Sequence, residues 1–211
     1  MNETMLTIVI LLMMVYSIIL HEIAHGYAAL RLGDETAYRL GRLTLNPVSH
    51  IDPFMTILMP LVTLLLSQGS FIFGGAKPVP VNPAAFRNPI RAFAITAAAG
   101  PLTNFSIALI FMGLLRIPFI APDESINQIV FEQAAILNVF LGVFNLIPIL
   151  PLDGGRVLTG LLPRNLAWAY ARTERFGIIG VLIVVILLDQ LHVLNYIYLH
   201  ILDLVKYLGG L

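Results

Sequence analysis

His21-Glu22-Ile23-Ala24-His25 is a polar stretch inside a long apolar segment, residues 5–30, and no charged side chain precedes it in that segment. Ionisable residues are costly at the depth of a bilayer, so they mark a functional site by default. On a helix, His21 and His25 share one face and can bind one metal ion. Glu22 lies about 100° further round, where it can reach a water on that metal without being a ligand. Two histidines, an open position and a carboxylate base are typical of a hydrolytic zinc site.

The composition indicates an integral membrane protein. Of the 211 residues, 58% are hydrophobic and 11% are charged, and the mean hydropathy is +0.89. Soluble proteins carry about a quarter charged residues. The lipid bilayer is therefore an expected partner, whereas zero net charge and the lack of a basic run indicate no nucleic-acid partner. Cysteine is absent, which excludes thiolate ligands and disulfides. No positive charge precedes the first apolar segment, so we expect it to be retained rather than cleaved as a signal peptide.

The apolar pattern predicts an all-α polytopic membrane protein of five to six apolar helices. A small membrane-associated β element is expected between the first and third helices, because residues 38–45 alternate enough for a short strand or hairpin. We expect a single domain over residues 1–211, with a catalytic core at about 5–160 and accessory helices at about 176–208. The expected helices are residues 5–30, 54–66, 92–115, 129–150, 176–188 and 191–208.

A catalytic zinc ion usually has three protein ligands and a water molecule. Asp153 is the strongest candidate for the third ligand, because it closes an apolar helix where prolines and glycines break the backbone. Irregular backbone at membrane depth is tolerated where it lines a cavity. The competing interpretation is an aspartate that caps a cytosolic loop. The other candidates are His50, His192, His200, Asp52 and Asp189.

These remaining histidines favour other roles. His50 is interpreted as structural or interfacial. His192 and His200 are two helical turns apart and could form a second metal site, but an interfacial role is favoured. Asparagines in membranes commonly join helices, and we favour that role for Asn104 and Asn138. For Asn145, both helix contact and donation to a developing oxyanion stay open.

Three motifs together resemble the site-2 protease family of intramembrane zinc metalloproteases. They are His-Glu-x-x-His at 21–25, Ala-Gly-Pro-x-x-Asn at 99–104, and Asn-x-x-Pro-x-x-Pro-Leu-Asp-Gly-Gly-Arg at 145–156. The resemblance covers roughly residues 15–160 and has the compact form without a PDZ or CBS domain.

This resemblance implies one zinc ion held by His21, His25 and Asp153, with Glu22 as the general base. It implies that Asn145 positions substrate or steadies the oxyanion. The implied substrate is a transmembrane helix of another protein, which the family often cleaves to release a regulator. The implied activity is therefore hydrolysis of a peptide bond within or near that helix.

The positions of the ligands predict the membrane topology. Asp153 follows the fourth long apolar segment and must reach a metal near the C-terminal half of the first, so these two helices run in the same direction. The chain then crosses an odd number of times between them, and residues 54–66 should re-enter rather than cross. This arrangement places eleven of the twelve lysines and arginines on one side, with only Arg116 on the other. The positive-inside rule then predicts an outside N-terminus, a cytosolic C-terminus and an active site opening to the cytosol of a prokaryotic cell.

The 77–83 segment, Lys77-Pro78-Val79-Pro80-Val81-Asn82-Pro83, is predicted to be an extended edge that meets substrate. In a strand, the N–H groups of Lys77, Val79 and Val81 would face one side, whereas the prolines on the other side have none. An exposed edge can hold a substrate by strand addition. The alternative is a proline-rich surface loop.

The same residues are also compatible with functions other than proteolysis. A metal transporter or channel could use the same His and Asp residues as an ion path, but such proteins spread ligands along a pathway and often contain repeats. A lipid hydrolase and an inactive binding relative are further alternatives. The clustering of the ligands in two motifs favours the protease.

Overall fold

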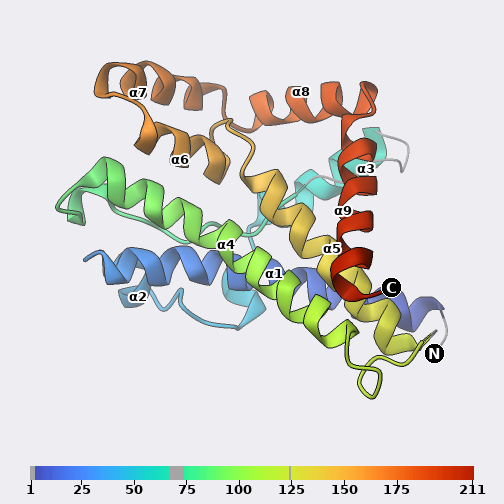
Figure 1. Cartoon of the computed structure of the whole chain (residues 1–211). Coiled ribbons are helices and arrows are strands. Elements are labelled where there is room, and N and C mark those ends of the chain that lie inside the picture. The colour runs from blue at the N-terminus through green and yellow to red at the C-terminus, as the bar shows by residue number, and fades with distance from the viewer. Residues whose placement is uncertain (1–2, 67–73, 124) are drawn as a thin grey trace.

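The computed structural model describes residues 3–66, 74–123 and 125–211, and these residues form helices joined by loops (Figure 1). The longest elements are α1, α4, α5 and α9. The elements in chain order are α1 (Glu3–Arg31), α2 (Thr36–Arg39), η1 (Pro47–His50), η2 (Pro53–Leu58), α3 (Met59–Leu66), η3 (Pro83–Ala85), α4 (Pro89–Leu115), α5 (Ile126–Asn145), α6 (Asp153–Leu161), α7 (Arg164–Ala171), η4 (Arg172–Phe176), α8 (Gly177–Gln190) and α9 (Val193–Gly209).

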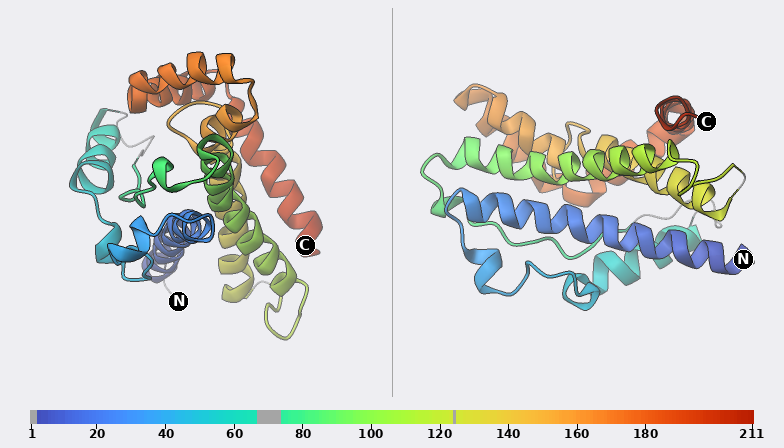
Figure 2. Two further views of the ribbon diagram at one scale, coloured as in Figure 1. Left: turned by 90° about the vertical axis from the view of Figure 1, so that its left-hand side faces the viewer. Right: turned by 60° about the horizontal axis from the view of Figure 1, so that its bottom comes forward.

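Three of these helices, α1, α4 and α5, are long and apolar enough to cross a membrane. The shortest of them has 20 residues, which spans about 30 Å, the thickness of a bilayer's hydrocarbon core. α4 runs antiparallel to α1, and α5 returns parallel to it (Figures 1 and 2). Large apolar side chains such as Leu12, Leu109 and Ile110 are more than half exposed on these helices. Such surface requires a lipid environment, so the protein is an integral membrane protein.

Small residues allow α4 and α5 to approach closely. A side chain at Gly142 on α5 would lie 2.6 Å from the ring of Phe105 on α4. Ala108 and Ala135 are also buried between the helices. Lipid tails are as apolar as these side chains, so the hydrophobic effect does not join helices in a bilayer. Van der Waals packing between closely spaced backbones does so instead. α9 covers the same core through residues such as Val205.

The expected count of five to six apolar helices is not confirmed, since three helices in the described residues are long and apolar enough to span. The apolar stretch Pro53–Leu65 is shorter than a span. α8 has 14 residues, a length of about 21 Å that falls short of the hydrocarbon core. α8 and α9 meet at an angle of 76° and together form one bent pair.

The expected β element is not found, and the described residues contain no strand. Residues 38–45 begin in α2 and continue as turns. Asp34 accepts hydrogen bonds from the Thr36 N–H and hydroxyl, and Arg39 pairs with Glu35 at 2.7 Å one turn away. These local contacts stabilise a helical turn, so they override the weak alternation that predicted a strand.

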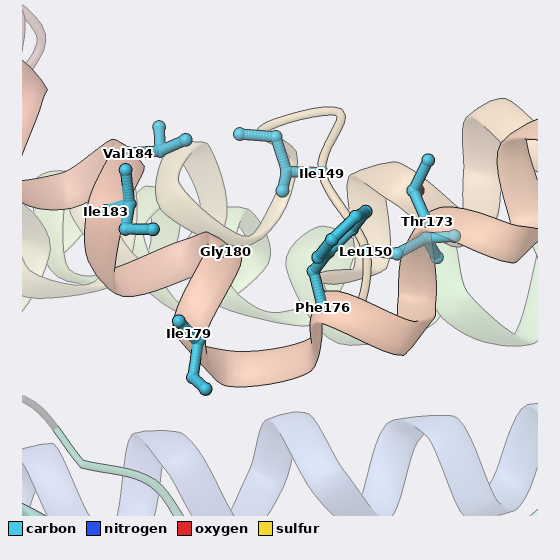
Figure 3. A pocket seen from close by; sticks show the side chains of 8 residues that line it. All are labelled: Ile149, Leu150, Thr173, Phe176, Ile179, Gly180, Ile183 and Val184. Atoms are coloured by element: carbon cyan, nitrogen blue, oxygen red, sulfur yellow. The ribbon is translucent and has the colours of Figure 1, made fainter.

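The C-terminal helices lie over the loop between α5 and α6. This loop, η4 and α8 line an open apolar pocket of about 260 Å³. Ile149 and Leu150 of the loop lie on one side, and Phe176 and Ile183 on the other (Figure 3).

Candidate active site

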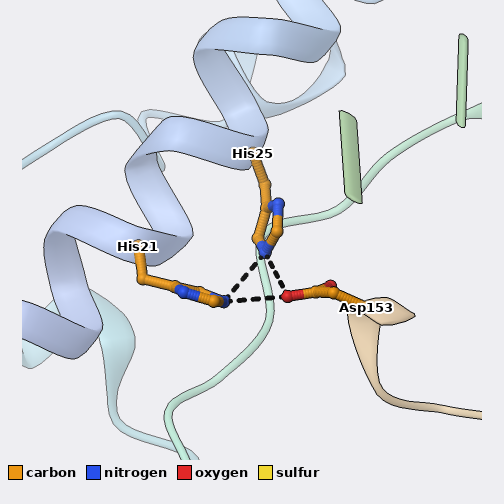
Figure 4. A group of neighbouring side chains, drawn as sticks. All are labelled: His21, His25 and Asp153. Carbon is orange, nitrogen blue, oxygen red and sulfur yellow. Dashed lines mark hydrogen bonds and ion pairs between the residues drawn. The ribbon is translucent and has the colours of Figure 1, made fainter. Parts of the chain in front are cut away.

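Three side chains of metal-ligand type meet at one point (Figure 4). α1 supplies His21 and His25, and Asp153 is the first residue of α6. The Nε2 atoms of the two histidines lie 3.0 Å apart. Asp153 Oδ2 is 3.0 Å from His21 Nε2 and 3.2 Å from His25 Nε2. All three side chains are buried, so the protein shields the group from bulk solvent.

A tight loop delivers Asp153 to the histidines. A side chain at Gly154 would collide with the carbonyl group of Leu146, and one at Gly155 would lie 2.6 Å from the backbone nitrogen of Leu150. Glycine is therefore required at both positions for the loop backbone to lie against the start of α6. This packing holds Asp153 in place at the beginning of that helix.

A backbone carbonyl sets the tautomer of His25. Its Nδ1 atom lies 2.8 Å from the carbonyl oxygen of Thr96 on α4. A carbonyl oxygen only accepts hydrogen bonds, so Nδ1 must carry the hydrogen. The Nε2 atom of the neutral ring then carries a free lone pair, and this is the tautomer that binds a metal through Nε2.

A chain of amides sets the tautomer of His21 in the same way. Asn138 donates its amide N–H to the Ala134 carbonyl at 2.9 Å, so its Oδ1 is the atom that accepts from Asn104 Nδ2 at 3.0 Å. Asn104 Oδ1 is therefore the atom 2.5 Å from His21 Nδ1. Asn138 also donates to the Ser17 hydroxyl on α1 at 2.9 Å. His21 Nδ1 carries the hydrogen, and its Nε2 is a second free lone pair.

The three facing atoms are consequently all acceptors. Asp153 Oδ2 is buried and has no hydrogen-bond donor among the described residues. Three acceptors at this separation repel one another unless a cation lies between them. Tetrahedral zinc with bonds of about 2.0 Å places its ligand atoms about 3.3 Å apart, close to the distances in this group. Two imidazoles and one carboxylate also form a typical donor set of catalytic zinc, so the residues fit one zinc ion.

Glu22 lies beside this group and outside it. Its carboxylate accepts a hydrogen bond from the Val79 N–H at 2.8 Å. Glu22, the two histidines and Asp153 line one cavity of about 320 Å³. A carboxylate held next to a metal-ligand group, with room for a water molecule, can act as a general base.

The 77–83 segment lies along α1 and contributes Pro78, Val79 and Val81 to the wall of this cavity. It is extended but pairs with no strand. The Lys77 N–H donates to the His50 carbonyl at 2.8 Å, so two of the three N–H groups in the predicted row already have partners within the chain. Lys77 itself is exposed and does not line the cavity.

Asn145 lines the cavity, but one of its amide hydrogens is occupied. Its Nδ2 atom donates to the Leu141 carbonyl one turn back on α5, at 3.0 Å. Its second amide hydrogen and its oxygen make no hydrogen bond to the described residues. Asn104 and Asn138 do join helices, as the sequence favoured, and they also orient His21, which sequence reasoning missed.

The other candidate ligands lie apart from the metal-ligand group. His50 is buried and its ring bonds the Thr44 carbonyl at 2.8 Å. Asp52 caps η2 by accepting from the N–H groups of Phe54 and Met55. His200 bonds the Tyr196 carbonyl at 2.9 Å. Within the described residues, one group of at least three such side chains could hold a metal, and it contains none of these.

Gly100 on α4 is a further residue of the site that sequence reasoning left without a role. A side chain there would lie 2.5 Å from the His25 ring and 2.6 Å from the His21 ring. The signal in the sequence was its position in the 99–104 motif, four residues before Asn104 and hence on the same face of the helix.

Comparison with known proteins agrees with this geometry. The family model for "Peptidase family M50" matches residues 120–188, a range that includes Asp153. The chain is 36% identical over 176 residues to YwhC, a candidate zinc metalloprotease of Bacillus subtilis, covering 81% of this chain and 76% of the relative. It is 32% identical to Rip2, a candidate zinc metalloprotease of Mycolicibacterium smegmatis, covering 82% and 63% of the two chains.

A more distant relative is the zinc metalloprotease MJ0392 of Methanocaldococcus jannaschii, at 25% identity over 84% of this chain and 40% of the relative. No solved structure matches the chain. The Bacillus relative is covered over most of its length, and the family model matches at the segment that supplies the acidic residue of the metal-ligand group. The chain therefore belongs to peptidase family M50, the site-2 protease family, and is a zinc metalloprotease.

Proposed function

We propose that this protein hydrolyses a peptide bond within or near a transmembrane helix of another membrane protein. The observation that carries the proposal is the depth of the metal-ligand group. His21 lies in a membrane-spanning helix, ten residues before its end at Arg31, which is about 15 Å along the helix. Peptide bonds that reach such a site belong to segments embedded in, or entering, the bilayer.

In this proposal His21, His25 and Asp153 hold one zinc ion, which when bound lowers the pKa of a water molecule and polarises a carbonyl group. Glu22 accepts the proton of the attacking water and returns it to the leaving amine. The Val79 N–H holds the Glu22 carboxylate in position for both transfers. The second amide hydrogen of Asn145 is available for the oxyanion that develops on the carbonyl.

The 77–83 segment is proposed to hold the substrate backbone. It does so mainly through carbonyl groups that accept hydrogen bonds, rather than through the expected row of N–H donors. The N–H groups of Lys77 and Val79 are used within the protein. The carbonyl groups of Pro78 and Pro80 accept no hydrogen bond from the described residues. We therefore assign the segment's substrate contacts to these carbonyls, to the Val81 N–H and to the apolar side chains of Val79 and Val81. An unwound substrate strand would donate its own N–H groups to this edge.

The orientation proposed from the charges is an outside N-terminus and an active site that opens to the cytosol. The ends of α1 and α4 nearest the metal-ligand group carry Arg31 and Arg91, whereas the loop between α4 and α5 carries only Arg116. Arg116 donates hydrogen bonds to the carbonyls of Tyr207 and Leu208, so the C-terminus lies at the Arg116 end of the molecule and the expected cytosolic C-terminus is not supported. With the bent pair α8 and α9 as a single span, Lys206 would join Arg116 on the outer side. Ten of the twelve basic residues would still be cytosolic, so the positive-inside rule supports the same orientation.

The experiment that tests the function compares Glu22→Gln with the wild type on a membrane-protein substrate in bicelles. We expect Glu22→Gln to retain one zinc ion and to lose cleavage, because Glu22 is a base and not a ligand. Asp153→Ala should lose both zinc and cleavage, because the two remaining histidines are too few ligands to hold the ion. Zinc per chain is measured by elemental analysis, and cleavage by mass spectrometry of the products.

Two outcomes would contradict the proposal. Normal cleavage by Glu22→Gln would remove Glu22 as the base, and zinc transport into sealed vesicles without any proteolysis would favour the transporter alternative. The structure gives that alternative no particular support, because the described residues bring together a single ligand group rather than a series along a path.

A further inference from the structure

Arg156 places a positive charge in the wall of the active-site cavity. It lies three residues after Asp153 on α6, so both side chains fall on one face of the helix. Both residues line the cavity that contains Glu22 and the two histidines. The cavity therefore has the metal-ligand group and a guanidinium side by side, and the reaction proposed above uses only the first.

The guanidinium is held in place but its hydrogen bonds are not satisfied. Its central carbon lies 5.3 Å from the centre of the Phe93 ring, which also lines the cavity. Stacking of this kind fixes the plane of the group. Its Nε atom is buried and has no hydrogen-bond partner in the described part of the chain. Among the described residues its one ion pair is to Glu174 of η4, at a long 3.9 Å, and the Glu174 side chain is 51% exposed.

The charges in the cavity leave Arg156 in need of a counter-ion. The carboxylates of Glu22 and Asp153 are balanced by a divalent metal bound at the site. Glu174 is then the remaining carboxylate near Arg156, and it is too distant for a direct hydrogen bond. A guanidinium with free donors binds a carboxylate through two parallel hydrogen bonds, which is its strongest and most selective interaction.

We propose that Arg156 binds the carboxylate of an aspartate or glutamate in the substrate, close to the scissile bond, and that Glu174 occupies this place in the absence of substrate. The inference rests on the proposed proteolytic function and adds a determinant of substrate choice. Acidic residues are rare in transmembrane segments because their burial is costly. A protease that recognises one can therefore select a few helices among many of similar hydrophobicity.

The neighbouring arginines do not share this role. Arg164, Arg172 and Arg175 are exposed and outside the cavity. Their charge is explained by an interfacial position on the cytosolic side. Arg164 therefore offers a matched control, since it is also a basic residue near the start of a C-terminal helix.

The test measures binding separately from cleavage. Fluorescent transmembrane peptides of leucine and alanine, flanked by lysines, carry one glutamate moved residue by residue along the helix. Each has a partner with glutamine at the same position. Binding to the zinc-loaded Glu22→Gln protein is measured by anisotropy in bicelles. For at least one position, we expect the glutamate peptide to bind about tenfold more tightly than its glutamine partner, as a charged hydrogen bond implies.

Arg156→Gln should abolish this preference, Arg156→Lys should keep part of it, and Arg164→Gln should leave it unchanged. Glu174→Gln should strengthen binding, because it removes the competing carboxylate. Equal zinc content shows that each variant is folded at the site. The inference is wrong if no peptide pair is distinguished, or if Arg156→Gln retains the preference. Loss of the proposed function has a different signature, namely no cleavage by wild type of any membrane substrate, whatever the binding preference.

Discussion

At the scale of single residues, the metal-ligand group depends on the absence of a side chain at Gly100. A Cβ atom there would lie 2.5 Å from Cε1 of His25 and 2.6 Å from Cε1 and Nε2 of His21. The rings cannot simply turn away, because each Nδ1 atom is tied to α4, one through the Thr96 carbonyl and one through Asn104. A single methyl group should therefore move both ligands.

Gly100→Ala is expected to lower zinc affinity by roughly 10- to 100-fold, the size of effect seen when groups that orient metal ligands are disturbed. Zinc affinity is measured by competition with a chromogenic chelator. Gly113→Ala is the control in the same helix, because a Cβ atom there meets nothing within 4 Å. Wild-type zinc affinity in Gly100→Ala would show that the helices shift at little cost.

Asp34 holds the 77–83 segment against the end of α1. Its carboxylate accepts hydrogen bonds from the Asn82 N–H at 2.6 Å and from the N–H and hydroxyl of Thr36. Burial raises the pKa of this carboxyl, but the hydrogen bonds from Thr36 and Asn82 outweigh burial and hold the pKa below its ordinary value of 3.8. The ionised form is therefore more favourable in the folded protein.

Asp34→Asn should lower the free energy of unfolding by about 1–3 kcal/mol at neutral pH, because the new amide N–H groups face backbone donors. The folded pKa is depressed, so this stabilisation is complete above the ordinary pKa and is lost as the pH falls through the folded value. Thermal unfolding in detergent at pH 7 and below pH 4 measures the difference between the two proteins. A difference that does not shrink on acidification would contradict the role of the ionised carboxylate.

At the scale of elements, the 77–83 segment and α1 form one unit through the bond from the Val79 N–H to Glu22. Val79→Pro removes this donor without adding charge. We expect turnover to fall at least about tenfold, because a misplaced general base loses much of its catalytic effect. Zinc content should stay the same, since no ligand is touched.

Val81→Pro separates two roles of the segment. The Val81 N–H donates no hydrogen bond to the described residues, so the substitution should leave Glu22 in place. Because the Val81 N–H is assigned to the substrate, we expect Val81→Pro to raise KM at unchanged zinc content, whereas Val79→Pro lowers kcat. An unchanged KM in Val81→Pro would mean that the segment acts only by holding the base.

At the scale of the whole molecule, the arrangement of helices makes the topology testable. α1 and α5 are parallel and α4 is antiparallel to them (Figure 2), so the two ends of α4 should lie on opposite sides of the membrane. We expect the 77–83 segment, which leads into α4, to be accessible from the side where α4 begins. The chain contains no cysteine, so a single introduced cysteine reports its own position.

Lys77→Cys should react with a membrane-impermeant maleimide only from the cytosolic side, and Phe119→Cys, which replaces a side chain that is 95% exposed, only from outside. Labelling is compared in intact cells and in inverted vesicles. Reaction of Lys77→Cys from outside the cell would overturn the proposed orientation.

The sequence by itself determined the features that depend on local spacing and composition. Helical periodicity predicts that His21 and His25 share one face, and their Nε2 atoms lie 3.0 Å apart in the structure. High hydrophobicity predicts the spanning helices. Residues 38–45 show where local pattern is insufficient. The hydrogen bond from the Thr36 N–H to Asp34 and the pair of Glu35 with Arg39 stabilise a helical turn at Thr36–Arg39, and the residues after it are irregular. A strand with such weak alternation would bury few side chains, so the local hydrogen bonds and the ion pair decide the conformation.

Only the tertiary structure decided the contacts between distant parts of the chain. Asn104 orients His21 across 83 residues, and the Val79 N–H reaches Glu22 across 57. Periodicity reports which face of a helix is apolar, but it does not report which partner occupies that face. The orientation of an amide or the direction of a backbone N–H is set when helices pack, because each buried donor must then find an acceptor.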